Sequence, residues 1–255
     1  MNLGVAEDTL IAVLLASVRA LAWLIAVPPF NSRLVPARVK AIVSVGIALP
    51  LAPMLVDSAP STADTGAFIG ALLEQVVVGA SLGFVTALFF AAVQAAGSMI
   101  DLFGGFSVAF AFDPFANTGT AVFGRFYNIL ATALLFATDG HALILRGFMT
   151  SFRALPLTGT LSLSTLSNLI TDGIDQMFLA ALQIAGPLIA VLFCTDVALG
   201  LLTRVAPGLN VFSLAFPVKI LLTIGVAGTA IVLLPQAFNG LIDRAVRAML
   251  TLIGG

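Results

Sequence analysis

Few side chains in this sequence could carry out chemistry. The single histidine, His141, follows Asp139 and Gly140 between two apolar regions, without further ligand-type residues at metal-binding spacing. Cys194 is the only cysteine, so the chain can form neither an intramolecular disulfide nor a cluster of thiolate ligands. The sequence also lacks a phosphate-binding glycine loop that ends in Lys and Ser or Thr. We therefore expect no enzyme active site, no bound metal and no cofactor.

Charged residues inside apolar stretches are the next candidates for function. They are Arg19, Glu74, Arg125, Asp196 and Lys219. A charged side chain at the centre of a bilayer costs about 3 kcal/mol or more, so we expect these residues to face protein or water. One alternative is that Asp196 and Lys219 form an intramembrane pair for a proton or small solute, which would make the chain a secondary transporter.

The elements that must position these residues are apolar helices. Hydrophobic residues make up 60% of the 255 residues and charged residues 9%, whereas an ordinary soluble domain is about 25% charged. A helix needs about 20 residues to cross a bilayer, and six apolar regions fit that length unevenly: residues 9–27, 41–56, 68–100, 121–138, 177–202 and 211–234. The sequence thus predicts an all-α integral membrane protein with about six hydrophobic helices, several of them broken, plus a C-terminal amphipathic helix.

The charge balance and the aromatic residues bear on possible partners. The 11 Lys and Arg residues and 12 Asp and Glu residues give a net charge of -1, which creates no attraction for nucleic acid. Against 20 Phe there are only Trp23 and Tyr127, although spans that meet lipid headgroups usually carry Trp and Tyr. Either the protein simply uses Phe, or it is poorly equipped to sit in lipid alone. Basic residues divide evenly between the two sides of a six-span arrangement, which leaves its orientation undecided.

Three segments fall outside these helices or at their ends. The first apolar region follows Glu7 and Asp8 and no basic residue, so we expect it to be retained and not cleaved as a signal peptide. Residues 157–173 are rich in Ser and Thr and predict a solvated connection. From Ala237 onward, apolar residues recur at helical spacing. They predict an amphipathic tail helix that lies on a membrane surface or against a partner.

The segment 101–117 combines many phenylalanines with residues that stop a helix. Gly104 and Gly105 permit backbone angles that end a helix, and Pro114 restricts the residue before it. Non-helical backbone at membrane depth must be buried in protein or line a cavity. This loop is therefore either a hydrophobic constriction in a pore, which could gate by dewetting, or a buried re-entrant loop with a packing role only.

Small residues also repeat at a spacing that allows close helix packing. Gly79 and Gly83 form a small-xxx-small face, and Gly66 with Gly70 repeats it earlier. Such a face serves either ordinary packing within the chain or a contact between subunits.

Motifs spread over nearly the whole chain resemble those of one family. They include Arg19 before Pro28, Gly79 before Gly83, and the most specific block, which comprises residues 200–207, 210–212 and 216–219. This pattern resembles the flagellar biosynthetic protein FliR family and its counterpart SctT in virulence type III secretion. The residues that carry the block include Arg204, Pro207, Asn210, Phe212, Pro217 and Lys219. One departure is Gly208, where the family usually has Gln, so the contact of that Gln cannot be carried over.

The resemblance implies one subunit of the export gate of a flagellar or type III secretion system in the bacterial inner membrane, associated with the flagellar basal body. Its partners would be FliP-like, FliQ-like and FlhB-like subunits, membrane lipid and unfolded export substrates. Residues 1–156 would be the FliP-like part, 157–176 a polar connection, and 177–255 a FliQ-like hairpin with the amphipathic tail. In the family, the loop that matches residues 104–117 is a pore plug. Carried over, this implies plug contacts by Phe106, Phe110 and Phe112, in a turn shaped by Asp113 and Pro114.

Overall fold

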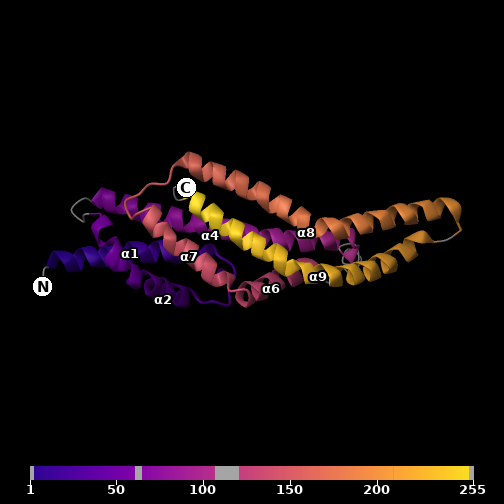
Figure 1. Cartoon of the computed structure of the whole chain (residues 1–255), viewed down its shortest axis with the longest axis horizontal. Helices are drawn as coiled ribbons and strands as arrows, with labels where there is room; N and C mark the ends of the chain where they lie inside the picture. Colours follow the sequence, from indigo (N-terminus) through magenta and orange to yellow (C-terminus); the bar gives the residue numbers. More distant parts are fainter. Residues whose placement is uncertain (1–2, 61–64, 107–120, 209, 253–255) are drawn as a thin grey trace. The chain divides into compact units, whose positions relative to one another are not determined.

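The computed structural model describes residues 3–60, 65–106, 121–208 and 210–252, and helices are the only regular secondary structure in these ranges. The expected all-α fold is therefore confirmed. The α-helices are α1 (Leu3–Ala26), α2 (Ala37–Ala48), α3 (Ala52–Leu55), α4 (Thr65–Phe103), α6 (Val122–Ala137), α7 (Gly140–Ala154), α8 (Leu163–Val205) and α9 (Val211–Leu252) (Figure 1). Two 3-10 turns, Leu49–Leu51 and Val56–Ser58, flank α3.

The six apolar regions are helical, but they differ in how well they could cross a membrane. Four segments are long and apolar enough, namely Glu7–Ala26, Ala37–Ser58, Thr65–Phe103 and Ser164–Val205. A fifth span results if α6 and α7, which are separated by Thr138 and Asp139, are counted as one. In α9 the apolar part, Ser213–Gly228, is shorter than these spans. The second region contains Pro50 and Pro53 and is interrupted by the 3-10 turn Leu49–Leu51, which agrees with the expectation that several of the helices are broken.

The chain divides into two compact units. Unit 1 comprises residues 1–89, 139–174 and 242–255, and unit 2 comprises residues 90–138 and 175–241. This division by packing does not test the FliP-like and FliQ-like parts that the resemblance implies, so that division stays a prediction.

The core of unit 1 is built around α1. Trp23 stacks on Phe148 of α7 with ring centroids 4.4 Å apart, and Phe148 packs edge-on against Phe152 at 5.4 Å. All three aromatic side chains are buried. Aromatic pairs in these geometries stabilise a core beyond the area that they bury, so α1 and α7 are held together by this stack.

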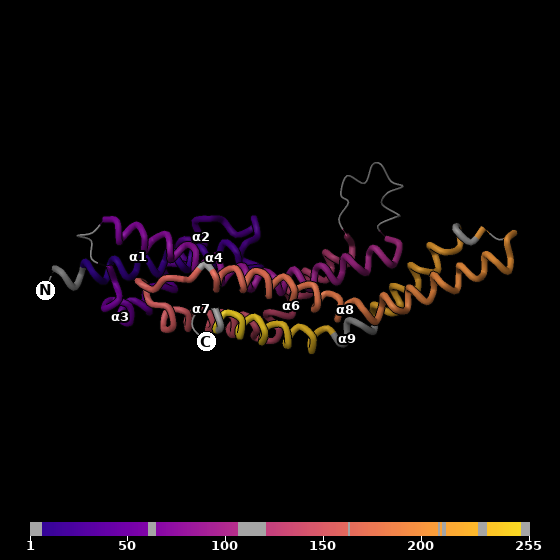
Figure 2. Tube along the Cα trace, turned by 90° about the horizontal axis from the view of Figure 1, so that it is seen from above, coloured from indigo at the N-terminus to yellow at the C-terminus, as the bar shows by residue number. Residues whose placement is uncertain are grey.

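Unit 2 contains the C-terminal part of α4, helix α6, and a hairpin. In this hairpin α8 and α9 lie side by side and run in opposite directions from the connection at residues 206–210 (Figures 1 and 2). Phe90 of α4 packs edge-on against Phe238 of α9 at 6.0 Å. The hairpin expected within residues 177–255 is therefore present, with Pro207 in its connection, whereas its FliQ-like character stays a prediction.

Helix α8 begins earlier than the Ser-rich and Thr-rich composition indicated. Its first residue is Leu163, so residues 163–176 are helical, and the expectation that the connection extends to 176 is wrong for them. The hydroxyl of Ser162 accepts the backbone N–H of Thr165 at 3.1 Å. This N-cap satisfies a backbone donor at the start of the helix, which is why a polar segment can begin it.

The C-terminal tail is an amphipathic helix, as expected, but it is the end of α9 and its apolar side is buried in the chain. Pro217 and Pro235 lie inside α9 without ending it. In unit 1, the Met249 sulfur and the Val246 side chain lie within contact distance of Gly147 on α7. The expectation that this side rests on a membrane surface or on a partner is therefore wrong, because α7 already covers it.

Candidate functional site: the stems of the phenylalanine-rich loop

The first stem of the loop is the end of α4. The helix stops at Phe103, and the N–H groups of Gly104 and Gly105 bond to the carbonyls of Ile100 and Leu102 at 2.8 and 3.4 Å. Gly105 has φ +83°, a left-handed conformation that favours glycine. The sequence therefore placed the end of this helix correctly at the glycine pair.

The second stem is the start of α6, and Asp101 of α4 holds it. The Asp101 carboxylate accepts the N–H of Phe123 at 3.1 Å and the N–H of Gly124 at 3.0 Å, one on each oxygen. The first N–H groups of a helix lack partners within the helix, and a carboxylate there is favoured by the helix dipole. Asp101 is buried, so the two stems are tied by a charge-assisted contact that no local sequence signal revealed.

Glycine allows both stems to approach their neighbours closely. A Cβ on Gly97 would lie 2.5 Å from the carbonyl oxygen of Phe123, and one on Gly104 would lie 2.7 Å from the hydroxyl of Thr223 on α9. Real Cβ atoms do not come so close to other atoms, so both positions require glycine unless a neighbour shifts. The end of α4 is therefore in close contact with the start of α6 at Gly97 and with α9 at Gly104.

Only one of the predicted plug residues lies in the described part of the chain. Phe106 is half-buried and packs edge-on against Phe123 at the start of α6, with ring centroids 5.2 Å apart. Phe110, Phe112, Asp113 and Pro114 lie outside the described residues. Their roles in a plug stay predictions.

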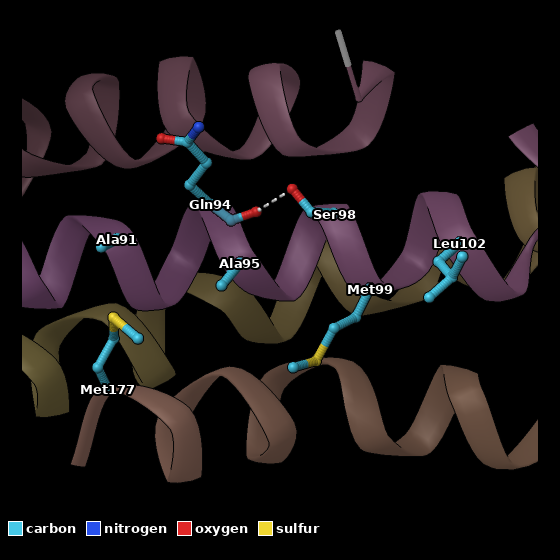
Figure 3. A pocket seen from close by; sticks show the side chains of 7 residues that line it. All are labelled: Ala91, Gln94, Ala95, Ser98, Met99, Leu102 and Met177. Carbon is cyan, nitrogen blue, oxygen red and sulfur yellow. Dashed lines mark hydrogen bonds between the residues drawn. The ribbon is translucent and has the colours of Figure 1, made fainter. Parts of the chain in front are cut away.

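A shallow groove of about 550 Å³ lies beside the first stem, between α4 and α8. Figure 3 shows Met99 and Met177 reaching into it from the two helices, while Gln94 points away toward α6, where its amide oxygen accepts Asn128 Nδ2 at 3.2 Å. No ionisable side chain lines the groove, which is formed by Ala91, Gln94, Ala95, Ser98, Met99, Leu102 and Met177. This lining suits apolar contact and supplies no acid or base that could activate the Ser98 hydroxyl.

In unit 1, Arg19 confirms that a charged residue in an apolar helix faces protein. Its side chain is fully buried, and its Nε donates to the Gln75 amide oxygen at 2.6 Å. Its Nη1 donates to the carbonyls of Leu155 and Ser151 at 3.0 and 3.3 Å, and the guanidinium lies 4.4 Å from the ring centroid of Phe152. The last carbonyls of a helix lack partners within it, and Leu155 is the C-cap residue of α7. Arg19 of α1 therefore caps α7 through the Leu155 carbonyl, whereas the Ser151 carbonyl also accepts the N–H of Leu155 at 2.9 Å.

The same network reaches the connection that precedes α8. Gln75 Nε2 donates to the carbonyl of Leu157 at 2.9 Å, and the Glu74 carboxylate accepts the N–H of Leu161. Arg19 and Glu74 were singled out by the sequence as charges in apolar helices, but Gln75 was not. Nothing in the local sequence indicates that the Gln75 side chain bonds both to Arg19 and to the connection before α8.

Gly79 and Gly83 serve packing within unit 1. A Cβ on Gly79 would overlap the carbonyl oxygen of Arg19, and one on Gly83 would lie 2.6 Å from the Cβ of Ala26. The small-residue face of α4 therefore receives the backbone of α1. Of the two roles left open by the sequence, the structure shows the contact within the chain.

Asp196 and Lys219 meet in the hairpin of unit 2, where Lys219 Nζ lies 2.5 Å from Asp196 Oδ1. The Asp196 side chain is 44% exposed, so this is a pair on the surface of the hairpin and not an enclosed solute site. Among the other residues of the family-like block, Asn210 Oδ1 accepts the N–H of Ser213 at 3.3 Å and so caps α9. Arg204 and Pro217 are exposed, Pro207 lies at the turn, and Phe212 lies in the first turn of α9.

Comparison with known proteins gives matches over most of the chain. The family model for bacterial export proteins, family 1, matches residues 10–245. The flagellar biosynthetic protein FliR of Pectobacterium carotovorum subsp. carotovorum is 34% identical over 219 residues, which cover 86% of this chain and 83% of that protein. FliR of Bacillus subtilis (strain 168) is 32% identical over 84% of this chain and 83% of its own length. The surface presentation of antigens protein SpaR of Shigella flexneri is 30% identical over 60% of this chain and 59% of its own length.

Proposed function

The chain belongs to the family of bacterial export proteins, family 1, and is similar to FliR proteins over most of its length. We propose that it is one subunit of the export gate of a flagellar or type III protein secretion system. The observation that carries this proposal is the match of the family model to residues 10–245, nearly the whole chain. Four apolar helices of spanning length support a place in the bacterial inner membrane. We propose no catalytic step for the chain.

The partners that we propose are FliP-like, FliQ-like and FlhB-like subunits, with unfolded export substrates as the cargo. In this proposal residues 1–156 are FliP-like and residues 177–255 are FliQ-like. The α8–α9 hairpin supports the proposed contacts with partner subunits, because many of its apolar side chains are exposed in the single chain, including Phe178, Phe193, Leu201 and Leu221. Exposed apolar faces of this size usually bind another protein or lipid.

The mechanism that we propose is a passive seal. Phe106, Phe110 and Phe112 exclude water and ions from the closed conduit, and the exported polypeptide displaces them. The two stems support this role, because Asp101 and the close contacts at Gly97 and Gly104 attach the ends of the loop to three helices. Apolar constrictions can block ions by dewetting.

The seal is tested by measuring ion leak through the assembled gate. Replacing Phe110 and Phe112 together by Ala is expected to raise the ion conductance of membranes that contain the gate, because smaller side chains leave room for water. Phe84→Ala is the matched control, since Phe84 is exposed on α4 in unit 1 and is not among the residues of the proposed seal, so the conductance should stay unchanged. Conductance that does not rise in the double variant would remove the seal from the proposal.

Membership of the gate is tested separately by purification in detergent. A gate subunit is expected to co-purify with FliP-like and FliQ-like proteins in a large complex. A chain that is folded and stable as a monomer or dimer, without these partners, would count against the proposed function and in favour of a transporter.

A further inference from the structure

Helix α6 has two apolar sides, and only one of them is covered. The covered side consists of Gly124, Tyr127, Ala131 and Leu135, which are all buried. Residues three and four positions apart lie on the same side of a helix, so these four form one stripe. This stripe attaches α6 to the rest of unit 2.

The opposite side, which we call the outer face of α6, consists of Val122, Arg125, Phe126, Ile129 and Ala133. Their spacing of three and four residues again makes one stripe. All five are exposed, and the exposed fractions of Val122, Phe126 and Ile129 are 46%, 43% and 60%. The outer face is therefore an apolar surface that carries one cation.

Arg125 has no acidic partner in the described part of the chain. Its backbone N–H bonds to the carbonyl of Ala121 at 2.9 Å, which continues the helix and does not involve the side chain. The Arg125 side chain is exposed, so a carboxylate of another protein could reach its guanidinium.

Water alone does not suit the outer face. Burying an apolar surface stabilises by about 25 cal/mol per Å², and contiguous exposed apolar residues mark places where protein or lipid binds. Phe126 and Ile129 lie on this surface one turn apart. Some apolar partner must therefore cover them.

Lipid alone does not suit it either. If Arg125 lay at the level of the headgroups and α6 ran along the bilayer normal, the end of α6 at Ala137 would lie about 18 Å deeper. Asp139 follows two residues after that end, before α7 begins. The hydrocarbon core is about 30 Å thick, so the exposed Asp139 would remain within it at a cost of about 3 kcal/mol. Placing Asp139 at the headgroups buries Arg125 in the same way.

We propose that the outer face of α6 binds an apolar helix of another membrane subunit, and that this helix places an Asp or Glu opposite Arg125. An apolar helix covers Phe126 and Ile129, and its carboxylate pairs with the guanidinium, on which two N–H groups can bond both carboxylate oxygens. The proposal rests on the proposed function only in that the other subunit belongs to the same export apparatus. The charge and the stripe themselves are properties of this chain.

The test is photo-crosslinking in the membranes of the organism that makes this protein. The full chain carries p-benzoylphenylalanine in place of Ile129 and is irradiated in three backgrounds: Arg125 unchanged, Arg125→Lys and Arg125→Glu. Arg146→Glu is the matched control, because Arg146 is an exposed cation on the neighbouring helix α7. Mass spectrometry then identifies the crosslinked peptide.

The expected product joins Ile129 to an apolar helix of a different membrane subunit that contains Asp or Glu near the crosslink. Arg125→Glu should lower the yield at least tenfold, while Arg125→Lys and Arg146→Glu should keep most of it. If Arg125→Glu prevents accumulation of the chain, the proposal is judged on the crosslinked peptide obtained with Arg125 unchanged, which must contain Asp or Glu.

Crosslinks to lipid, to a helix without a carboxylate, or to a second copy of this chain would overturn the proposal, as would a yield that Arg125→Glu leaves unchanged. Co-purification with the export apparatus is measured on the same membranes. A chain that co-purifies but crosslinks only to lipid would refute this inference and leave the proposed function standing. A chain outside any such complex would refute the proposed function.

Discussion

Replacing Arg19 with Met should destabilise unit 1 strongly. The substitution removes the bonds from Nε to the Gln75 amide oxygen at 2.6 Å and from Nη1 to the Leu155 carbonyl at 3.0 Å. A hydrogen bond to a charged group contributes about 1.5–3 kcal/mol, so the two together contribute about 3–6 kcal/mol. Methionine fills much of the volume and avoids the cost of burying a charge. We therefore expect a loss near the lower end, about 3–4 kcal/mol.

The assay is the thermal midpoint of the detergent-solubilised protein, followed as the fraction that remains monodisperse after heating. A loss of 3–4 kcal/mol corresponds to a midpoint lower by about 10 °C for a chain of this size. Arg19→Lys keeps the charge but loses the planar donor group, so it should fall between the parent and Arg19→Met. Arg153→Met, at an exposed position in the last turn of α7, is the control and should change little. A midpoint for Arg19→Met that matches the control would refute the reasoning that Arg19 is the cap of α7.

Four further variants test unit 2 by the same heating assay. Gly97→Ala should lower the free energy of unfolding by about 1–3 kcal/mol, because its Cβ would press on the backbone of Phe123. Gly225→Ala is the matched control: its Cβ meets no atom within 4 Å, and it should raise the free energy of unfolding by about 0.5–1 kcal/mol through helix propensity. Asp101→Ala should lose about 1–2 kcal/mol with the two N–H bonds at the start of α6. Lys219→Met should change stability by less than about 1 kcal/mol, because the partner carboxylate of Asp196 is 44% exposed.

Each of these variants has an outcome that contradicts its structural basis. Equal midpoints for the two Gly→Ala variants would mean that α4 and α6 do not approach at Gly97. A large loss for Lys219→Met would mean that its ion pair is buried in an assembly. For Asp101, the matched control is Asp101→Asn, which keeps one acceptor oxygen and should recover part of the loss.

Much of the fold could be predicted because it depends on local chemistry. Long apolar stretches predicted the helices, and Gly104 with Gly105 predicted the end of α4. The hairpin could be predicted because two long apolar stretches of similar length lie on either side of Pro207. The start of α8 was missed because its cap depends on one hydroxyl, Ser162, among many Ser and Thr residues.

The tail helix shows where periodicity stops being informative. The apolar stripe on residues 237–253 indicated that one side must be buried, and it is. Whether a membrane, a partner or another helix of the chain covers that side depends on contacts that are distant in sequence. Here the contact is with Gly147, roughly a hundred residues earlier.

By itself the sequence determined that the chain is helical and apolar, and which residues carry charges inside its apolar stretches. These properties follow from side-chain type and spacing, which act over one or two turns of helix. Tertiary structure alone decided how those charges are satisfied: Arg19 bonds to the end of α7, Asp101 bonds to the start of α6, and Arg125 stays exposed. A hydrogen bond needs its two atoms within about 3 Å, and only the folded chain brings together groups that are more than a hundred residues apart.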